Sequence, residues 1–173
     1  EVDYETLWDT EVHLGKLNDY DWLHLHHEDF TGQHGKFYRS HRNSNWYKQQ
    51  KSQFQNIASK FGYPSVHEHK KGISRIIKNY VKDGGFLFAM CSATDSYDIA
   101  LAMGDIDGVE AVYDGTPTNS DIQNSLDYSQ CFAFENFKII PDPMIYEFSD
   151  IDFPPSHNPI ARGAKADYFT LFE

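Results

Sequence analysis

The stretch FLFAMCSATDS, residues 86–96, decides the fold class of this chain. Its first six residues form a short, unbroken apolar run, which is typical of a central strand covered on both faces. The run follows a predicted helix that begins near Val66 and ends at the turn Asp83–Gly85. A further helix is predicted from Tyr97 to Met103, with Ser and Asp of SATDS as candidate N-caps. Strand, sharp turn and helix therefore surround Cys91 and predict an α/β fold.

The whole chain, residues 1–173, fits one domain of the flavodoxin-like kind: a three-layer, doubly wound and mainly parallel sheet. Apolar residues at near-helical spacing predict a surface helix over residues 44–61. Strands are predicted at residues 2–7, 20–26, 109–113, 130–140, 145–148 and 168–172. Because the terminal patterns break off within strands, we expect the domain to be incomplete at both ends. A sheet position beside residues 20–26 is then expected to be open.

Composition excludes several kinds of partner. The chain has 26 acidic and 15 basic residues and a net charge of −11, which disfavours binding to nucleic acid or to anionic lipid. No apolar run reaches the ~20 residues of a membrane span. Two cysteines and no CxxC pair indicate neither a disulfide framework nor a zinc finger. The sequence implies no cofactor.

The turn at Cys91 has the form of a nucleophile elbow, in which a strand stops, a reactive residue occupies a strained turn and a helix follows. Ala89 and Ala93 stand where the commoner motif has two glycines. A thiol at a helix N-terminus favours the thiolate, and the amide of Ser92 would stabilise an oxyanion. The competing interpretation is that Cys91 is a buried thiol that acts as a small hydrophobe.

Histidines and acids gather where the strand over residues 20–26 ends, in the segment LHLHHEDFTGQH. In a flavodoxin-like sheet this strand is expected to neighbour the strand over residues 86–91. Neighbouring parallel strands end at the same edge of a sheet, so we expect His27 or Glu28 to approach Cys91. In an acid/base interpretation, His27 or His26 accepts the Cys91 proton, and Glu28 or Asp29 orients the imidazole.

Two other interpretations of this segment stay open. His24 and His26 share one face of the strand, and with His34 or Glu28 they offer zinc-type ligands. Alternatively, His24 and His26 are structural histidines bonded to backbone. A further pair, His67 and His69, lies two residues apart on a predicted helix and is expected on the solvated surface.

The segment VKDGGFLFAMCSATDSYDIALA, residues 81–102, resembles the elbow of the class I glutamine amidotransferase-like superfamily. GGFLFAMCSATDS is especially similar to the ThuA-like branch, whose usual form is close to GGGFVGIHAATDT, with His where this chain has Cys91. DYDWLHLHHEDFTGQ, GGFLFAMCSATD, YEFSDID and DYFTLFE together resemble a bacterial family that carries the label asparagine synthetase B. This resemblance implies an internal portion of an exported protein, in the periplasm or cell envelope.

The resemblance also shows a departure. Class I glutaminases take their base from a late His-x-Glu, whereas the late His157 of this chain has no acid two residues on. We therefore expect first a non-catalytic binding or assembly module. Its aromatic loops would hold a carbohydrate, another small molecule or a protein partner; the candidate aromatics are Trp46, Tyr47, Tyr97, Tyr113 and Tyr128. The alternative is a Cys-dependent hydrolase or amidotransferase that acts on a small amide or ester, with Cys91 as nucleophile.

Overall fold

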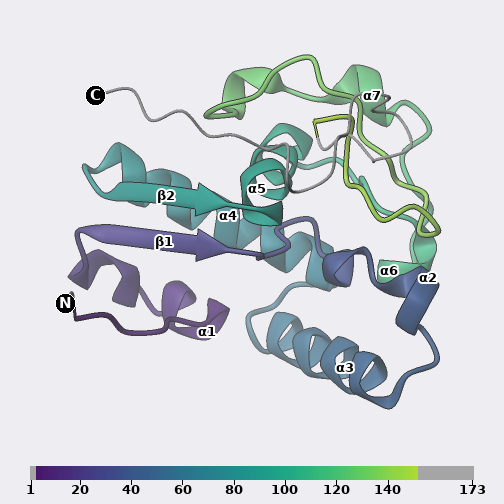
Figure 1. Ribbon diagram of the computed structural model, residues 1–173, viewed down its shortest axis with the longest axis horizontal. Helices are drawn as coiled ribbons and strands as arrows, with labels where there is room; N and C mark the ends of the chain where they lie inside the picture. The colour runs from purple at the N-terminus through teal and green to yellow at the C-terminus, as the bar shows by residue number, and fades with distance from the viewer. Residues whose placement is uncertain (1–2, 152–173) are drawn as a thin grey trace, which may run out of the picture.

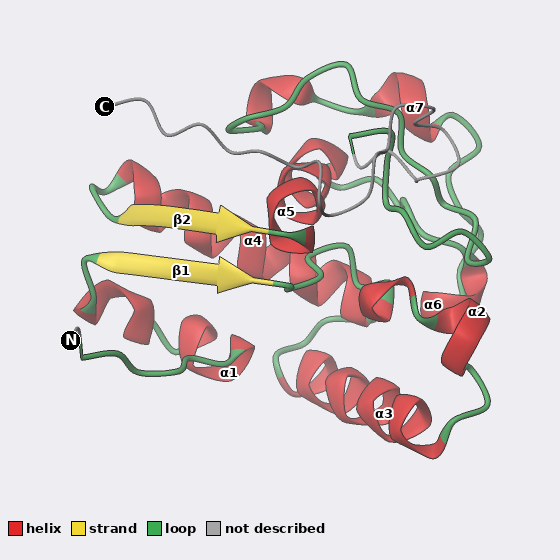
Figure 2. Cartoon of the chain, viewed as in Figure 1, coloured by secondary structure: helices red, strands yellow, loops and turns green. Residues whose placement is uncertain are grey.

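The computed structural model describes residues 3–151 and shows a mixed α/β domain with a small parallel sheet (Figures 1 and 2). In chain order, the α-helices and strands are α1 (Asp9–His13), β1 (Trp22–His26), α2 (Tyr38–His41), α3 (Asn45–Lys60), α4 (Val66–Lys82), β2 (Phe86–Met90), α5 (Ser92–Met103), α6 (Ala111–Asp114) and α7 (Ile122–Ser125). Short 3₁₀ turns lie at Lys16–Asp19, His34–Lys36 and Tyr128–Gln130. The predicted α3, α4 and β2 are confirmed, and α5 begins earlier than predicted.

The two strands pair as expected. β1 and β2 run parallel, with Trp22 opposite Phe86 and His26 opposite Met90. The connection between them carries α2, α3 and α4, as a parallel pair requires a long crossover. Both strands therefore end at the same edge of the sheet, beside the start of α5 (Figure 1).

The inner face of the sheet packs on α4 and α5 and forms the main core. Leu25 is buried there, with Leu23, Leu87 and Ala89 packed partly against the same cluster. The helices contribute Ile73, Ile77, Tyr80, Ala93, Tyr97, Ala100 and Leu101. At the start of α4, the Ser65 hydroxyl accepts the Glu68 amide at 3.1 Å, which satisfies one of the free N–H groups of the first turn.

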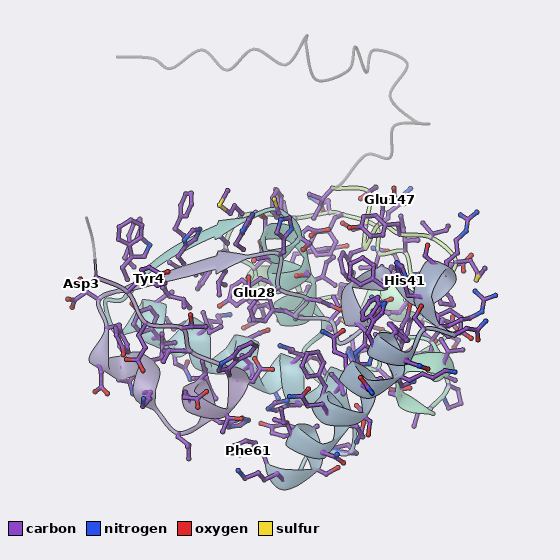
Figure 3. All side chains as sticks on the ribbon, turned by 60° about the horizontal axis from the view of Figure 1, so that its bottom comes forward. Asp3, Tyr4, Glu28, His41, Phe61 and Glu147 are labelled. Atoms are coloured by element: carbon purple, nitrogen blue, oxygen red, sulfur yellow. The ribbon has the colours of Figure 1, made fainter. Side chains whose placement is uncertain are left out.

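The outer face of the sheet is open, contrary to the expectation of cover on both sides. Trp22, Phe86 and Phe88 are 57%, 58% and 45% exposed. Figure 3 shows side chains standing on this face of the strands. Within residues 3–151 the sheet has two strands and helices on one face, so the predicted third layer is not observed. With two strands, β2 is an edge strand and not the central strand that was predicted.

Several strand predictions are wrong. Residues 109–113 overlap the single helical turn α6 and form no strand, and Tyr113 of this turn is buried. Residues 130–140 and 145–148 form no strand and share only the antiparallel bridge between Ile139 and Ser149. Backbone amides of this segment bond instead to the carboxylate of Asp98 on α5, each at 2.8 Å; the donors are Phe132, Ala133 and Phe134. A side chain has thus replaced a neighbouring strand as the hydrogen-bond acceptor.

The N-terminal segment is also irregular: residues 3–7 form no strand. The Glu5 carboxylate accepts hydrogen bonds from the Tyr20 hydroxyl and from Lys16, which ties the segment to the turn before β1. Side-chain anchoring therefore takes the place of sheet pairing here. The strand predicted at residues 168–172 lies outside the described residues.

His67 and His69 are buried, which corrects their expected surface position. The Nδ1 atom of His67 lies 2.6 Å from the Thr31 carbonyl, and its Nε2 atom accepts the Gly108 amide at 3.3 Å. The ring of His69 packs against the rings of His13 and Phe61, with centroids 5.1 and 6.0 Å away. Both histidines serve the packing of α4 against its neighbours, which a two-residue spacing could not indicate.

Candidate functional site

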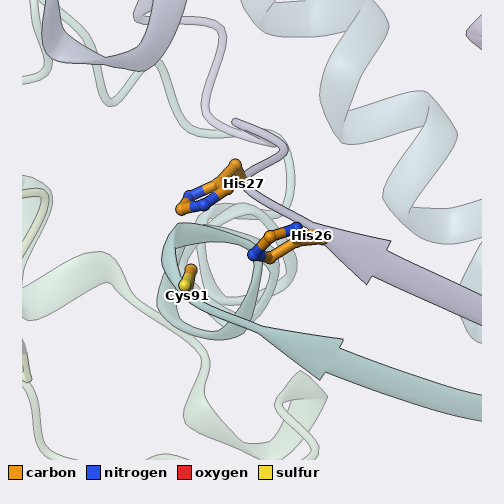
Figure 4. Close-up of side chains that lie close together, drawn as sticks. All are labelled: His26, His27 and Cys91. Carbon is orange, nitrogen blue, oxygen red and sulfur yellow. The ribbon is translucent and has the colours of Figure 1, made fainter.

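The candidate site lies where β1 and β2 end. His26 closes β1, His27 follows it, and Cys91 follows β2. A ring nitrogen of each histidine and the Cys91 sulfur all lie within 4.8 Å of one another, and all three side chains are exposed (Figure 4). The predicted approach of His27 to the Cys91 turn is therefore confirmed.

Cys91 occupies a strained backbone conformation between β2 and α5. Its φ of 55° and ψ of −141° lie in a region that non-glycine residues rarely adopt. Cys91 is itself the N-cap of α5, where Ser and Asp were expected. Its carbonyl accepts the Thr94 amide at 3.0 Å and the Thr94 hydroxyl at 2.7 Å. These two hydrogen bonds fix the backbone of Cys91 at a sharp strand-to-helix turn, and its thiol is exposed, as in a nucleophile elbow.

His27 reaches this turn because its backbone also departs from the strand. Successive side chains on a strand point to opposite faces, which would separate His26 from His27. The φ of His27 is 66°, and the two imidazole rings lie side by side with centroids 4.0 Å apart. A positive φ at the strand end therefore gathers two adjacent histidines beside the thiol.

A cleft of about 890 Å³ opens beside His27 and Cys91. His27, Cys91 and Ser92 form part of its wall, together with the buried Asp95 of α5. The lining also includes aromatic residues from distant segments, among them Phe37, Phe134 and Tyr146. Sequence reasoning did not find these three residues, because loops without regular structure carry them to the site.

Glu28 lies away from Cys91. It lines a separate groove of about 490 Å³ between residues 3–7 and β1, at the sheet position expected to be open. Burial raises the pKa of its carboxyl, and its Oε2 atom is buried without a hydrogen-bond partner. Its expected part in the Cys91 site gains no support from this position.

The other acid and the other two histidines proposed for the site have partners elsewhere. The Asp29 carboxylate accepts the Thr31 amide at 2.7 Å and the Gly35 amide at 2.8 Å, so it shapes that loop. His34 is buried among the rings of Tyr47, Phe54 and Tyr113. The Nε2 atom of His24 lies 3.3 Å from the Met90 sulfur. The metal set that joined His24 and His26 with His34 or Glu28 does not assemble.

The second cysteine offers a contrast. Cys131 is half-buried, and its sulfur donates to the Asp98 carbonyl at 3.4 Å. Burial raises the pKa of the Cys131 thiol to about 12. Cys131 is therefore an unreactive thiol in the same chain as the exposed Cys91.

The expected aromatic loops divide between core and surface. Tyr47, Tyr97 and Tyr113 are buried, so they cannot hold an external ligand. The hydroxyl of Tyr128 donates to the Phe137 carbonyl at 2.7 Å. Trp46 is exposed and packs on Phe37, whose ring is 6.0 Å away. None of the five expected aromatics lines the cleft beside Cys91, although Phe37, the neighbour of Trp46, does.

Comparisons of the chain with models of protein families, with curated proteins and with solved structures find no match. Within residues 3–151, no helix is long and apolar enough to cross a membrane.

Proposed function

We propose that the domain is a Cys-dependent hydrolase or amidotransferase that acts on a small amide or ester, with Cys91 as nucleophile and His27 as base. One observation carries the proposal: the thiol stands in a strained strand-to-helix turn with an imidazole nitrogen within 4.8 Å of its sulfur. Strained turns of this kind concentrate at active sites. An exposed thiol beside an imidazole is the usual pairing of an activated cysteine.

The chemistry would proceed in two steps. His27 accepts the Cys91 proton while the sulfur attacks the substrate carbonyl carbon, and the backbone amide of Ser92 stabilises the oxyanion. The first amides of a helix have no acceptor within the helix, so the Ser92 N–H is suited to this task. The imidazolium then protonates the leaving amine or alcohol, which leaves a thioester on Cys91. Water, deprotonated by His27, hydrolyses the thioester and restores the thiol.

The same site supports the proposed fold family, a class I amidotransferase-like domain of the flavodoxin-like type. The parallel β1–β2 pair, the sharp turn at Cys91 and the following α5 are the parts this family would place at its elbow. The base would come from the end of the neighbouring strand instead of from a late His-x-Glu. His27 would thus take the role that the late His-x-Glu has in class I glutaminases.

A second candidate is a binding module of a cell-envelope protein. The observation that favours it is the aromatic part of the cleft lining, where the ring centroids of Phe37 and Tyr146 lie 6.1 Å apart. Aromatic faces at the edge of a cleft suit stacking against a sugar ring or contact with a protein. This function needs the cleft but no reactive thiol.

Turnover of small esters and amides separates the two candidates. We expect the wild type to hydrolyse a panel of p-nitrophenyl esters and primary amides, Cys91→Ala to abolish turnover, and His27→Asn to lower kcat by at least about 100-fold. Asn is the matched replacement because it tolerates a positive φ. Cys131→Ala is the control and should retain the wild-type rate. Turnover that survives in Cys91→Ala would reject the nucleophile.

Saturable binding of oligosaccharides without turnover, lost when Phe37 and Tyr146 are changed to Ala, would select the binding module instead.

A further inference from the structure

We propose that His26, His27 and Cys91 form a binding site for a single zinc-type divalent ion. The three side chains offer two imidazole nitrogens and one sulfur, all within 4.8 Å of one another. Among the described residues, this is the one group of three or more such side chains with its ligand atoms so close together. The inference goes beyond the proposed hydrolase and does not depend on it.

The spacing is close to what a tetrahedral ion requires. Zinc–nitrogen and zinc–sulfur bonds of about 2.0–2.3 Å place neighbouring ligand atoms roughly 3.5 Å apart. The observed limit of 4.8 Å therefore demands a contraction of about 1 Å, which small changes of side-chain torsion can supply. All three side chains are exposed, so no packing has to be broken for this adjustment.

The backbone has already made the larger adjustment. His27 and Cys91 adopt φ values of 66° and 55°, and these bring a residue from the end of each strand towards His26. Both strands end at this edge and are tied by five register pairs, so the ligands come from a rigid frame. A metal ion would thus find its ligands largely pre-arranged, which lowers the entropy lost on binding.

The ligand set indicates which ion would bind. Two nitrogens and a thiolate suit zinc and its spectroscopic substitute Co²⁺, while Mg²⁺ and Ca²⁺ prefer oxygen ligands. Three protein ligands leave the fourth position to water or to a small molecule in the cleft of about 890 Å³. A bound ion would also hold the Cys91 sulfur and protect it from alkylation.

The test uses the full chain, treated with a chelator and then titrated with Co²⁺. We expect one equivalent of Co²⁺ to produce a thiolate-to-cobalt charge-transfer absorption in the near ultraviolet and to slow the alkylation of Cys91 at least tenfold. Cys91→Ser should abolish the absorption. His26→Ala and His27→Asn should each weaken Co²⁺ binding by more than about 10-fold. Loss of a residue that only supports a ligand already costs about 10-fold or more in metal affinity, and loss of a ligand itself should cost more.

His24→Ala is the matched control, because His24 is an exposed histidine on the same strand that lies outside the group. It should bind Co²⁺ as the wild type does. Equal weakening in His24→Ala and His27→Asn would show dispersed binding by surface histidines and would overturn the site. Absence of the charge-transfer absorption would overturn it as well. Because absorption and alkylation are read without substrate, the metal site and the hydrolase can fail independently.

Discussion

His27 and Cys91 occupy equivalent positions in neighbouring strands, each directly after the last register pair, His26 and Met90, and each with a positive φ. A sheet edge with two such residues side by side is unusual, because a sparsely populated backbone conformation costs a non-glycine residue roughly 1–3 kcal/mol. The same distortion directs an imidazole and a thiol towards one another. We interpret the local strain as the feature that builds the site.

The strain at Cys91 predicts how glycine behaves there. The free energy of unfolding of Cys91→Gly should exceed that of Cys91→Ala by about 1 kcal/mol, because glycine adopts the observed φ of 55° without a steric penalty. Urea unfolding of the two variants measures the difference. Ala93 lies inside α5 and is the control, where Ala93→Gly should cost about 1 kcal/mol. A Cys91→Ala protein as stable as Cys91→Gly would contradict the strained turn.

Asp98 predicts which interaction holds the loop beside the cleft. Its carboxylate accepts three backbone amides, from Phe132, Ala133 and Phe134, each at 2.8 Å. Asp98→Ala should lower the free energy of unfolding by about 3 kcal/mol, because these charge-assisted bonds are lost from a buried group. Limited proteolysis should then cut near residues 131–134.

The exposed Asp105 provides the comparison for Asp98. Its ion pair with Arg75 spans 4.0 Å at the surface, so Asp105→Ala should change stability by less than about 0.5 kcal/mol. If both substitutions had the same small effect, the carboxylate of Asp98 would not be organising the loop.

Buried histidine predicts a loss of stability in mild acid. Burial lowers the pKa of His34 to about 4, whereas an unfolded chain returns it to about 6.5. Between these values the unfolded state binds more protons, so the contribution of His34 is full above about pH 6.5 and is lost as the pH falls towards 4. His34→Asn keeps a polar side chain that tolerates the observed φ of 53°.

Urea unfolding at pH 7 and pH 4.5 checks this expectation. The wild type should lose on the order of 2 kcal/mol more than His34→Asn between the two conditions. Equal losses in the two proteins would show that His34 does not titrate with folding.

The two faces of the sheet predict unequal costs of substitution. Leu25 is 6% exposed on the inner face, and Leu25→Ala should lower the free energy of unfolding by about 2–4 kcal/mol. Phe88 lies on the open outer face, and Phe88→Thr should cost less than about 1 kcal/mol. Comparable costs at the two positions would mean that the outer face is covered in the folded protein.

The sequence predicted the elements whose signals are local. Apolar periodicity with Gly84 located α4, and the unbroken run before Cys91 located β2 and its pairing with β1. It failed where a distant side chain decides the structure: Asp98 takes the amides of a segment that alternates like a strand, and His67 bonds to Thr31 and Gly108 from inside the core. The approach of a histidine from the end of β1 to Cys91 was predictable from parallel strands, but the placement of His27 beside His26 was not, because it depends on the positive φ of His27.

The rate of acylation of Cys91 by an activated ester, followed by intact mass and peptide mapping, tests the central claim most directly. The account predicts a covalent acyl adduct on Cys91, none on Cys131, and acylation at least about 100-fold slower in His27→Asn. Cys131 is the internal reference because its pKa of about 12 keeps it protonated. Acylation of Cys91 at an equal rate in the wild type and His27→Asn would contradict the account.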